Sequence, residues 1–273
     1  MTAQRTHRYL RIALFVAVVA LAVSVGGDII VRGGVVLPSL SDYYYSPAGP
    51  MFTAALCVVT VALLALSGRD AESTLLDVAA VFVPLIAVIP TGKDGSPSVP
   101  AEFLPAVHNG VWTYVVVTTL LVIMGVVLAA AGLVAARRTF IVAATAAGTA
   151  LAVGVLAFAP PWREQFPFPG GVNLHLVVTI AFFAVFAAVP IVNALPRHRE
   201  PGEGALVPRY RAIYLAVPSL LVVTLVVTIV IGPRFPDAPV VFAGEATALA
   251  LFAAYWLAQT VERWDQADPR GIR

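Results

Sequence analysis

The stretch VWTYVVVTTLLVIMGVVLAAAGLVAA, residues 111–136, contains no charged side chain and ends directly against Arg137 and Arg138. A helix needs about 20 mostly apolar residues to cross the hydrocarbon core of a bilayer, and this run is longer than that. Because that core holds no water to satisfy backbone N–H and C=O groups, such a run is expected to be helical. The stretch therefore predicts a transmembrane helix that ends at a basic boundary.

Similar apolar runs recur along the whole chain. Of the 273 residues, 60% are hydrophobic and 12% are charged, and that charged share is about half of the share usual in a soluble domain. The sequence therefore predicts an all-α integral membrane protein, a single polytopic domain over residues 1–273 with about eight transmembrane helices. The predicted helices cover residues 9–26, 51–67, 75–91, 111–136, 140–159, 174–195, 213–232 and 241–262.

The distribution of positive charge predicts the orientation of these helices. With the N-terminus inside, the inner segments carry 13 of the 17 Lys and Arg residues, and the outer segments carry four. Cytoplasmic segments are the ones enriched in Lys and Arg, so both ends of the chain are expected to be cytoplasmic. Residues 1–8 and 263–273 are then short cytoplasmic tails of a multi-pass protein of the cell membrane, and membrane lipids are its first partners.

The first apolar run has a second interpretation. A basic start, an apolar stretch and small residues near Ser24–Gly27 also describe a cleavable signal peptide. The run is long for a signal peptide and no A-x-A site ends it, so a first transmembrane helix is the preferred interpretation. If the segment were cleaved, seven helices would remain with the same orientation.

Charge and motifs exclude several classes of function. The formal net charge is only +2, which argues against a nucleic-acid partner, because such binding depends on clustered Lys and Arg. The sequence contains neither a P-loop, nor a Cys-rich zinc pattern, nor a G-x-G-x-x-G opening a helix after a strand. A single cysteine, Cys57, cannot form an intrachain disulfide.

Each helix that returns from the outer side carries an ionisable group near its outer end. Asp42 precedes the second predicted helix, His108 precedes the fourth, His175 begins the sixth, and Glu245 lies in the first turns of the eighth. An acid inside a membrane helix costs about 2.5–3.5 kcal/mol at mid-bilayer and less near the interface, and it usually faces a partner in the bundle. The sequence therefore predicts a polar pocket that faces outward, with His108, His175 or Arg234 as partners of Glu245.

The segment SLSDYYYSPAGP, residues 39–50, adds aromatic side chains to this region. Its tyrosines are either part of the aromatic belt at the membrane surface or one wall of the pocket. The candidate pocket residues are Asp42, Tyr43, Tyr44, His108, His175 and Glu245.

Each candidate also has a plainer role. Asp42 would cap a turn, His108 would be solvated in a loop, His175 would bond a loop carbonyl, and Glu245 would be a partner of the helix dipole. Asp77, in the first turn of the third predicted helix, is interpreted as structural.

The same residue types could bind a metal. Two histidines and two carboxylates, namely His108, His175, Asp42 and Glu245, would complete a zinc-like shell. A bound metal lowers the pKa of its water, and a carboxylate such as Asp42 or Glu245 would act as the base. Such a site would hydrolyse amide or ester bonds of lipids.

The residues also resemble a known family. The motif S-D-Y-Y-Y at 41–45, A-V-I-P-T at 87–91, a histidine that starts a later helix, and E-x-x-A-x-A with W-L in the last helix resemble the bacterial integral membrane proteins grouped as domain of unknown function 998. The resemblance spans most of the chain and implies a multi-helix membrane bundle without an established activity.

A more distant resemblance is to the membrane hydrolases related to alkaline ceramidases, which carry a serine, an aspartate and histidines around zinc. It implies such roles for Ser41 or Asp42, His108 and His175. Those enzymes have H-x-x-x-H on a late helix, whereas this chain has Glu245 and Leu249 there, which puts zinc hydrolysis in doubt.

Three functions follow as hypotheses. The first is a membrane protein that binds a lipid or small ligand in a polar outer-facing pocket, and the second is the metal-dependent lipid hydrolase, so whether the protein is an enzyme stays open. The third is a small transporter, for which Pro84 and Pro218 could break helices. Transporter sites usually lie near the bilayer midplane, where this chain offers mainly Ser and Thr.

Overall fold

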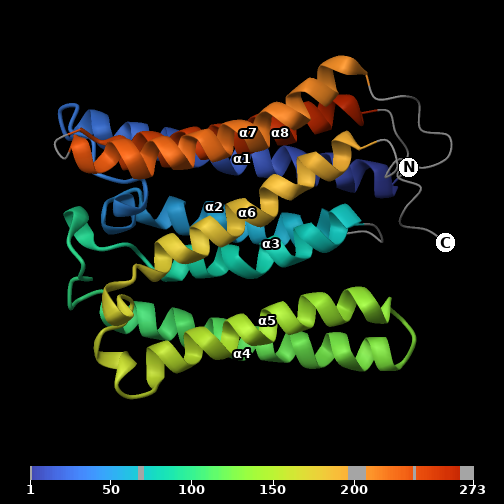
Figure 1. Cartoon of the computed structure of the whole chain (residues 1–273), viewed down its shortest axis with the longest axis horizontal. Coiled ribbons are helices and arrows are strands. Elements are labelled where there is room, and N and C mark those ends of the chain that lie inside the picture. Colours follow the sequence, from blue (N-terminus) through green and yellow to red (C-terminus); the bar gives the residue numbers. More distant parts are fainter. Residues whose placement is uncertain (1, 67–70, 196–206, 236–237, 265–273) are drawn as a thin grey trace.

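The computed structural model describes residues 2–66, 71–195, 207–235 and 238–264. Within these ranges, eight helices are long and apolar enough to cross a membrane, which confirms the predicted eight-helix bundle (Figure 1). The helices are α1 Thr2–Val31, α2 Gly49–Leu66, α3 Ala71–Val88, α4 Leu104–Ala130, α5 Ala136–Phe158, α6 Leu174–Ala194, α7 Pro208–Ile231 and α8 Val240–Glu262. Short 3-10 helices lie between them, and the one that matters for the site is η1, Ser41–Tyr45.

Helix ends differ from the prediction where polar residues or proline occupy the first turns. Helix α1 begins at Thr2, so the segment predicted as tail 1–8 is helical from residue 2, because a helix continues beyond the apolar run that reveals it. Helix α4 begins at Leu104 instead of residue 111, with a proline in its first turn, where the missing N–H costs nothing. Of the predicted tail 263–273, residues 265–273 lie outside the described residues.

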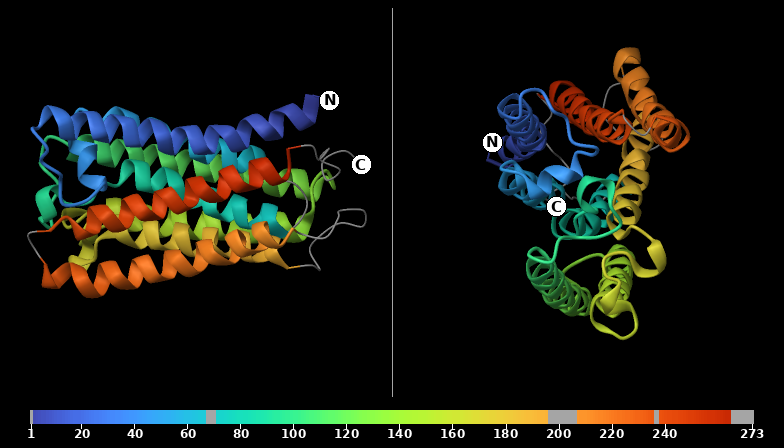
Figure 2. Two further views of the ribbon diagram at one scale, coloured as in Figure 1. Left: turned by 90° about the horizontal axis from the view of Figure 1, so that it is seen from above. Right: turned by 90° about the vertical axis from the view of Figure 1, so that its left-hand side faces the viewer.

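Six of the helices form a closed ring. Contacts run from α1 to α2, from α2 to α3, from α3 to α6, from α6 to α7, from α7 to α8 and from α8 back to α1. The end-on view in Figure 2 shows this ring, with η1 folded across one of its ends. We name that end the outer end and the opposite one, where α1 begins and α8 ends, the inner end, after the orientation that the charge distribution predicts.

Helices α4 and α5 form a hairpin outside this ring. The two helices pack against each other and against α3 (Figures 1 and 2). Only 6% of the most apolar part of α4 is buried. Most of α4 therefore presents apolar side chains to the surroundings, as a lipid-facing helix does.

Aromatic side chains fill the ring between its two ends. Phe182 and Phe186 of α6 meet Phe252 and Tyr255 of α8, and the ring centroids of Phe186 and Phe252 are 4.8 Å apart. Trp256 of α8 packs against Phe252. All five side chains are buried. This packing separates a polar cluster at the outer end from a polar network at the inner end.

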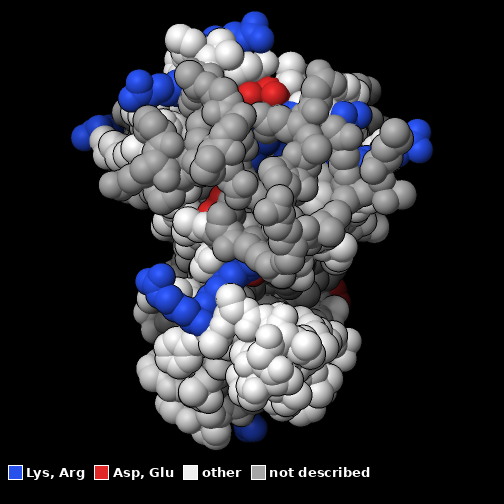
Figure 3. Space-filling view, turned by 90° about the vertical axis from the view of Figure 1, so that its right-hand side faces the viewer, with Lys and Arg blue, Asp and Glu red and all other residues white. Residues whose placement is uncertain are grey.

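Reporter fusions test the orientation. The inner face carries arginine side chains around its rim (Figure 3), and the positive-inside rule predicts that this face is cytoplasmic. A reporter active only in the cytoplasm, inserted at Leu133 between α4 and α5, is expected to be active, whereas the same reporter at Gly95 between α3 and α4 is expected to be silent. The reverse pattern would contradict the orientation.

Candidate functional site

The segment that carries η1 is held by a reciprocal pair of hydrogen bonds. The backbone N–H of Ser39 donates to Oδ2 of Asp42 at 3.2 Å, and the backbone N–H of Asp42 donates to Oγ of Ser39 at 3.1 Å. This S-x-x-D arrangement is a capping box. Burial raises the pKa of the Asp42 carboxyl, while the hydrogen bonds from Ser39 oppose the rise. In the structure Asp42 thus binds the backbone of Ser39 at the start of η1.

The three tyrosines attach η1 to its surroundings. Tyr43 is fully buried, and its ring lies 5.9 Å from that of Phe242 on α8. The hydroxyl of Tyr45 donates to the backbone carbonyl of Thr91 at 2.6 Å. Burial raises the pKa of all three tyrosine hydroxyls. Tyr43 is therefore a core residue, not a member of an interfacial belt.

Ser41, His175 and Glu245 come together at the outer end, and we call them the outer cluster. They belong to η1, α6 and α8. The Oγ atom of Ser41 lies 2.6 Å from Nε2 of His175 and 3.3 Å from Oε1 of Glu245. The other carboxyl oxygen of Glu245 accepts the backbone N–H of Leu40 at 2.6 Å and that of Ser41 at 3.4 Å. The cluster thus fastens η1 to two helices of the ring.

The histidine ring of the outer cluster has an assignable tautomer. Its Nδ1 lies 2.6 Å from the backbone carbonyl oxygen of Ile89. A carbonyl oxygen can only accept, so Nδ1 carries the hydrogen, and Nε2 of the neutral ring is left as an acceptor toward Ser41. The His175 side chain, 3% exposed, is therefore oriented from both sides.

His108 lies apart from the other candidates. It belongs to the second turn of α4 and not to the preceding loop, its Nδ1 lies 2.9 Å from the carbonyl oxygen of Leu104, and its ring packs against Phe158 and Phe166. In the part of the chain that the structure describes, no group of three or more His, Cys, Asp or Glu residues could hold a metal ion. The expected zinc-like shell of Asp42, His108, His175 and Glu245 is thus not assembled there.

A large hollow lies between the hairpin and the ring, and we call it the lateral groove. Its volume is about 1140 Å³, and it is lined by α2, α3, α4 and α5. Most lining side chains are apolar, among them Ala80, Leu121, Val122, Val142 and Ala143. The candidate pocket residues are not among its lining, so the hollow is separate from the outer cluster.

The inner part of the lateral groove contains an ion pair. The guanidinium of Arg138 on α5 donates to Oδ2 of Asp77 on α3 through NH2 at 2.5 Å and through Nε at 3.2 Å. Both side chains are largely buried, with 22% and 15% exposure. Asp77 thus has the structural role that the sequence indicated, and it also lines the groove.

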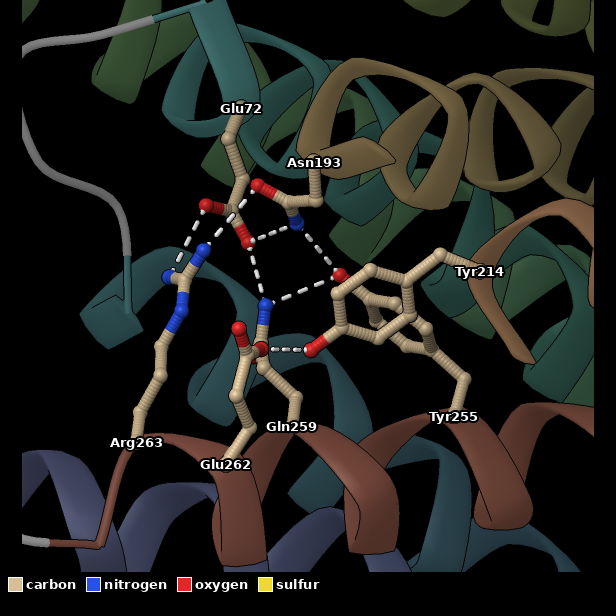
Figure 4. A network of polar contacts seen from close by, with 7 residues as sticks. All are labelled: Glu72, Asn193, Tyr214, Tyr255, Gln259, Glu262 and Arg263. Carbon is tan, nitrogen blue, oxygen red and sulfur yellow. Dashed lines mark hydrogen bonds and ion pairs between the residues drawn. The ribbon is translucent and has the colours of Figure 1, made fainter. Parts of the chain in front are cut away.

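A second polar cluster, which the sequence did not reveal, lies at the inner end of the ring (Figure 4). We call it the inner network; it consists of Glu72, Asn193, Tyr214, Tyr255, Gln259, Glu262 and Arg263. Oε1 of Glu72 accepts from the amide groups of Asn193 at 2.9 Å and Gln259 at 2.7 Å. Both amides also donate to the hydroxyl oxygen of Tyr255, at 2.7 and 2.8 Å.

Arg263 completes the inner network. Its NH1 donates to Oε2 of Glu72 at 3.2 Å, and its NH2 donates to Oδ1 of Asn193 at 3.1 Å. Burial alone lowers the pKa of Arg263, but Glu72, Tyr255, Tyr214 and Glu262 together outweigh that effect and raise the pKa above its ordinary value. The Tyr214 hydroxyl donates to Glu262. The network therefore ties α3, α6, α7 and α8 together through satisfied polar groups, as buried groups require.

No protein-family model, curated protein or solved structure matches the chain. The resemblances drawn from the short motifs therefore stay predictions.

Proposed function

We propose that this multi-pass membrane protein binds a phospholipid of the inner leaflet, with its acyl chains in the lateral groove and its phosphate at Arg137 and Arg138. The observation that carries the proposal is the hollow of about 1140 Å³ with an apolar lining and an ion pair in its inner part. Ligand pockets are usually about 300–1000 Å³, so the groove suits a long ligand.

The position of the groove supports a lipid as its occupant. On α4 its lining runs from Gly110 to Leu128, which spans about 27 Å at 1.5 Å per residue. The hydrocarbon core of a bilayer is about 30 Å thick. An apolar hollow at this depth is poorly solvated by water, whereas an acyl chain can enter it sideways from the bilayer and contact its walls.

The inner part of the groove supports the charge of the headgroup. Arg138 lines the groove and Arg137 is its exposed neighbour. Guanidinium groups bind phosphate oxygens with strong, directed hydrogen bonds. Asp77 keeps Arg138 in place and balances part of its charge, which favours a phospholipid headgroup over a highly charged free anion.

Lipid retention tests this function. The full chain, purified in mild detergent, is expected to keep a bound phospholipid that native mass spectrometry detects. The substitutions Val122→Phe and Ala143→Phe together fill the groove from both sides of the hairpin and should lower lipid occupancy about tenfold, equivalent to about 1.4 kcal/mol. Arg137→Gln should weaken the preference for phospholipids over neutral lipids while the Asp77–Arg138 pair stays intact.

Val126→Phe is the matched control, because Val126 is 53% exposed on the same helix and does not line the groove. It should keep the lipid. Equal retention by Val126→Phe and the groove-filling variant would contradict the proposal. A mass of two chains without lipid would instead assign the groove to a second copy.

A further inference from the structure

The outer cluster has too few hydrogens for both contacts of Ser41 if His175 is neutral and Glu245 is ionised. The serine hydroxyl has one hydrogen, yet it lies within hydrogen-bonding distance of Nε2 of His175 and of Oε1 of Glu245. The neutral ring has its hydrogen on Nδ1, which faces Ile89. If Glu245 were ionised as well, one of the two contacts would join two acceptors.

The two oxygens of Glu245 are used differently, and this indicates where an additional hydrogen belongs. Oε2 accepts the N–H groups of Leu40 and Ser41, as the carbonyl oxygen of a carboxylic acid does. Oε1 faces the Ser41 hydroxyl alone among these contacts. A hydrogen on Oε1 would complete a chain from Glu245 through Ser41 to His175, with each donor facing an acceptor.

We infer that the outer cluster binds one proton, which Ser41 passes between the carboxyl group of Glu245 and the imidazole of His175. In the transfer, the Oε1–H bond breaks as Ser41 Oγ takes that hydrogen, and the hydroxyl's own hydrogen forms a bond to Nε2. The neutral acid and neutral ring become a carboxylate and an imidazolium. The total charge of the cluster is unchanged, and both hydrogen bonds of Ser41 are kept in either state.

The surroundings of the cluster favour the bound proton. A further carboxyl group that acts on Glu245 is that of Asp42, which belongs to the same 3-10 helix as Ser41, and Asp94 in turn lies near Asp42. Asp28 of α1 is paired with Arg32, so that arginine is engaged. On its other side, His175 contacts the backbone carbonyl of Ile89 at the end of α3, which is uncharged. A cluster without the proton would add a second buried negative charge beside Asp42, which is costly in a medium of low dielectric constant.

Loss of this proton would weaken the attachment of η1. The Ser41 hydroxyl could then satisfy only one partner, and the carboxylate of Glu245 would face an oxygen lone pair. Because the cluster lies under the outer surface, it makes the hold on η1 depend on the pH of the outer compartment.

The pH dependence of unfolding tests the inference. In unfolded chains the pKa of Glu is about 4.3 and that of His about 6.5, so above pH 7.5 the unfolded cluster holds essentially no proton. The native state then holds one more proton than the unfolded state, and stability falls as pH rises. In reversible unfolding by sodium dodecyl sulfate, the unfolding constant should rise about tenfold per pH unit until the native proton is released.

Glu245→Gln is the informative variant, because its amide keeps a carbonyl acceptor for Leu40 and supplies a permanent N–H donor to Ser41. It needs no proton, so its unfolding constant should rise less steeply above pH 7.5 than that of the unaltered chain. The difference should correspond to about one proton, or about a tenfold change per pH unit. Glu102→Gln, at an exposed carboxylate of the outer loop, should leave the slope unchanged. Equal slopes for the unaltered chain and Glu245→Gln would overturn the inference.

A measurement on the unaltered chain covers the case in which the variant does not fold. In nanodiscs at pH 7.5, infrared spectra with labelled glutamate and nitrogen NMR with labelled histidine report the two groups separately. Either a protonated carboxyl group or an imidazolium is expected in the outer cluster. An ionised Glu245 together with a neutral His175 would disprove the shared proton.

Discussion

Glu72→Ala is expected to lower the free energy of unfolding by about 3–5 kcal/mol, the range seen when one partner of a buried ion pair is removed. The carboxylate accepts hydrogen bonds from Asn193, Gln259 and Arg263 at the inner end. Its removal leaves a guanidinium with 12% side-chain exposure without that carboxylate. Reversible unfolding in sodium dodecyl sulfate measures the loss.

Two further variants separate the charge from the hydrogen bonds. Glu72→Gln keeps the oxygen that accepts from the two amides and loses the charge opposite Arg263, so its cost should be intermediate. Glu102→Ala removes an exposed carboxylate and should change stability by less than about 0.5 kcal/mol. If Glu72→Ala behaved like Glu102→Ala, the inner network would not be a determinant of stability.

Gly49→Ala is expected to destabilise the chain by about 1–3 kcal/mol, the usual cost of overpacking. A Cβ atom at this position would lie 2.3 Å from the backbone carbonyl oxygen of Tyr44. Because the obstacle is backbone, either η1 or the start of α2 must move. The same displacement should disturb the contacts of Ser41. The pH dependence of stability above pH 7.5 should therefore become weaker, in addition to the loss of stability itself.

Gly148→Ala is the control for this change. A Cβ atom there meets nothing within 4 Å, and alanine is favoured over glycine inside a helix by about 1 kcal/mol. It should therefore be neutral or stabilising in the same unfolding assay. Unchanged stability of Gly49→Ala would show that η1 is not packed as closely against α2 as the structure describes.

The eight helices could be predicted because the bilayer imposes a length and an apolar composition that a single sequence displays. Their ends could not, since a helix may continue through residues that hydropathy does not mark. Thr2 to Arg8 continue α1, and residues 104–110 precede the apolar run of α4. The second shift also changed the setting of His108, which lies on α4 and packs against Phe158 and Phe166.

The outer cluster was partly predictable. Glu245 and His175 stand out because ionisable groups are scarce in membrane helices, and the structure brings both to Ser41. Ser41 itself was considered only through a family resemblance, because a hydroxyl in a polar segment is too common to be a signal. The proposed pairing of Glu245 with a histidine is thus mediated by a serine.

The inner network and the lateral groove depend on which helices are neighbours, and one sequence does not contain that information. Gln259 and Asn193 are uncharged and unremarkable until α8 and α6 meet α3 beside Glu72. Likewise, Asp77 and Arg138 are 61 positions apart, and their pairing follows from the way in which the hairpin packs on α3. Nothing in the periodicity of either helix predicts it.

The segment that contains α4 and α5 leaves the six-helix ring after α3 and rejoins it before α6, and the two ends of this segment are in contact. The side-chain amide of Asn173, just before α6, donates to the hydroxyl of Thr91, just after α3, at 3.0 Å. The residues between Thr91 and Asn173, including α4 and α5, therefore form an insertion whose two ends lie side by side. Such an insertion can change in length, or acquire a new ligand preference, while the six-helix ring with its outer cluster and inner network stays closed.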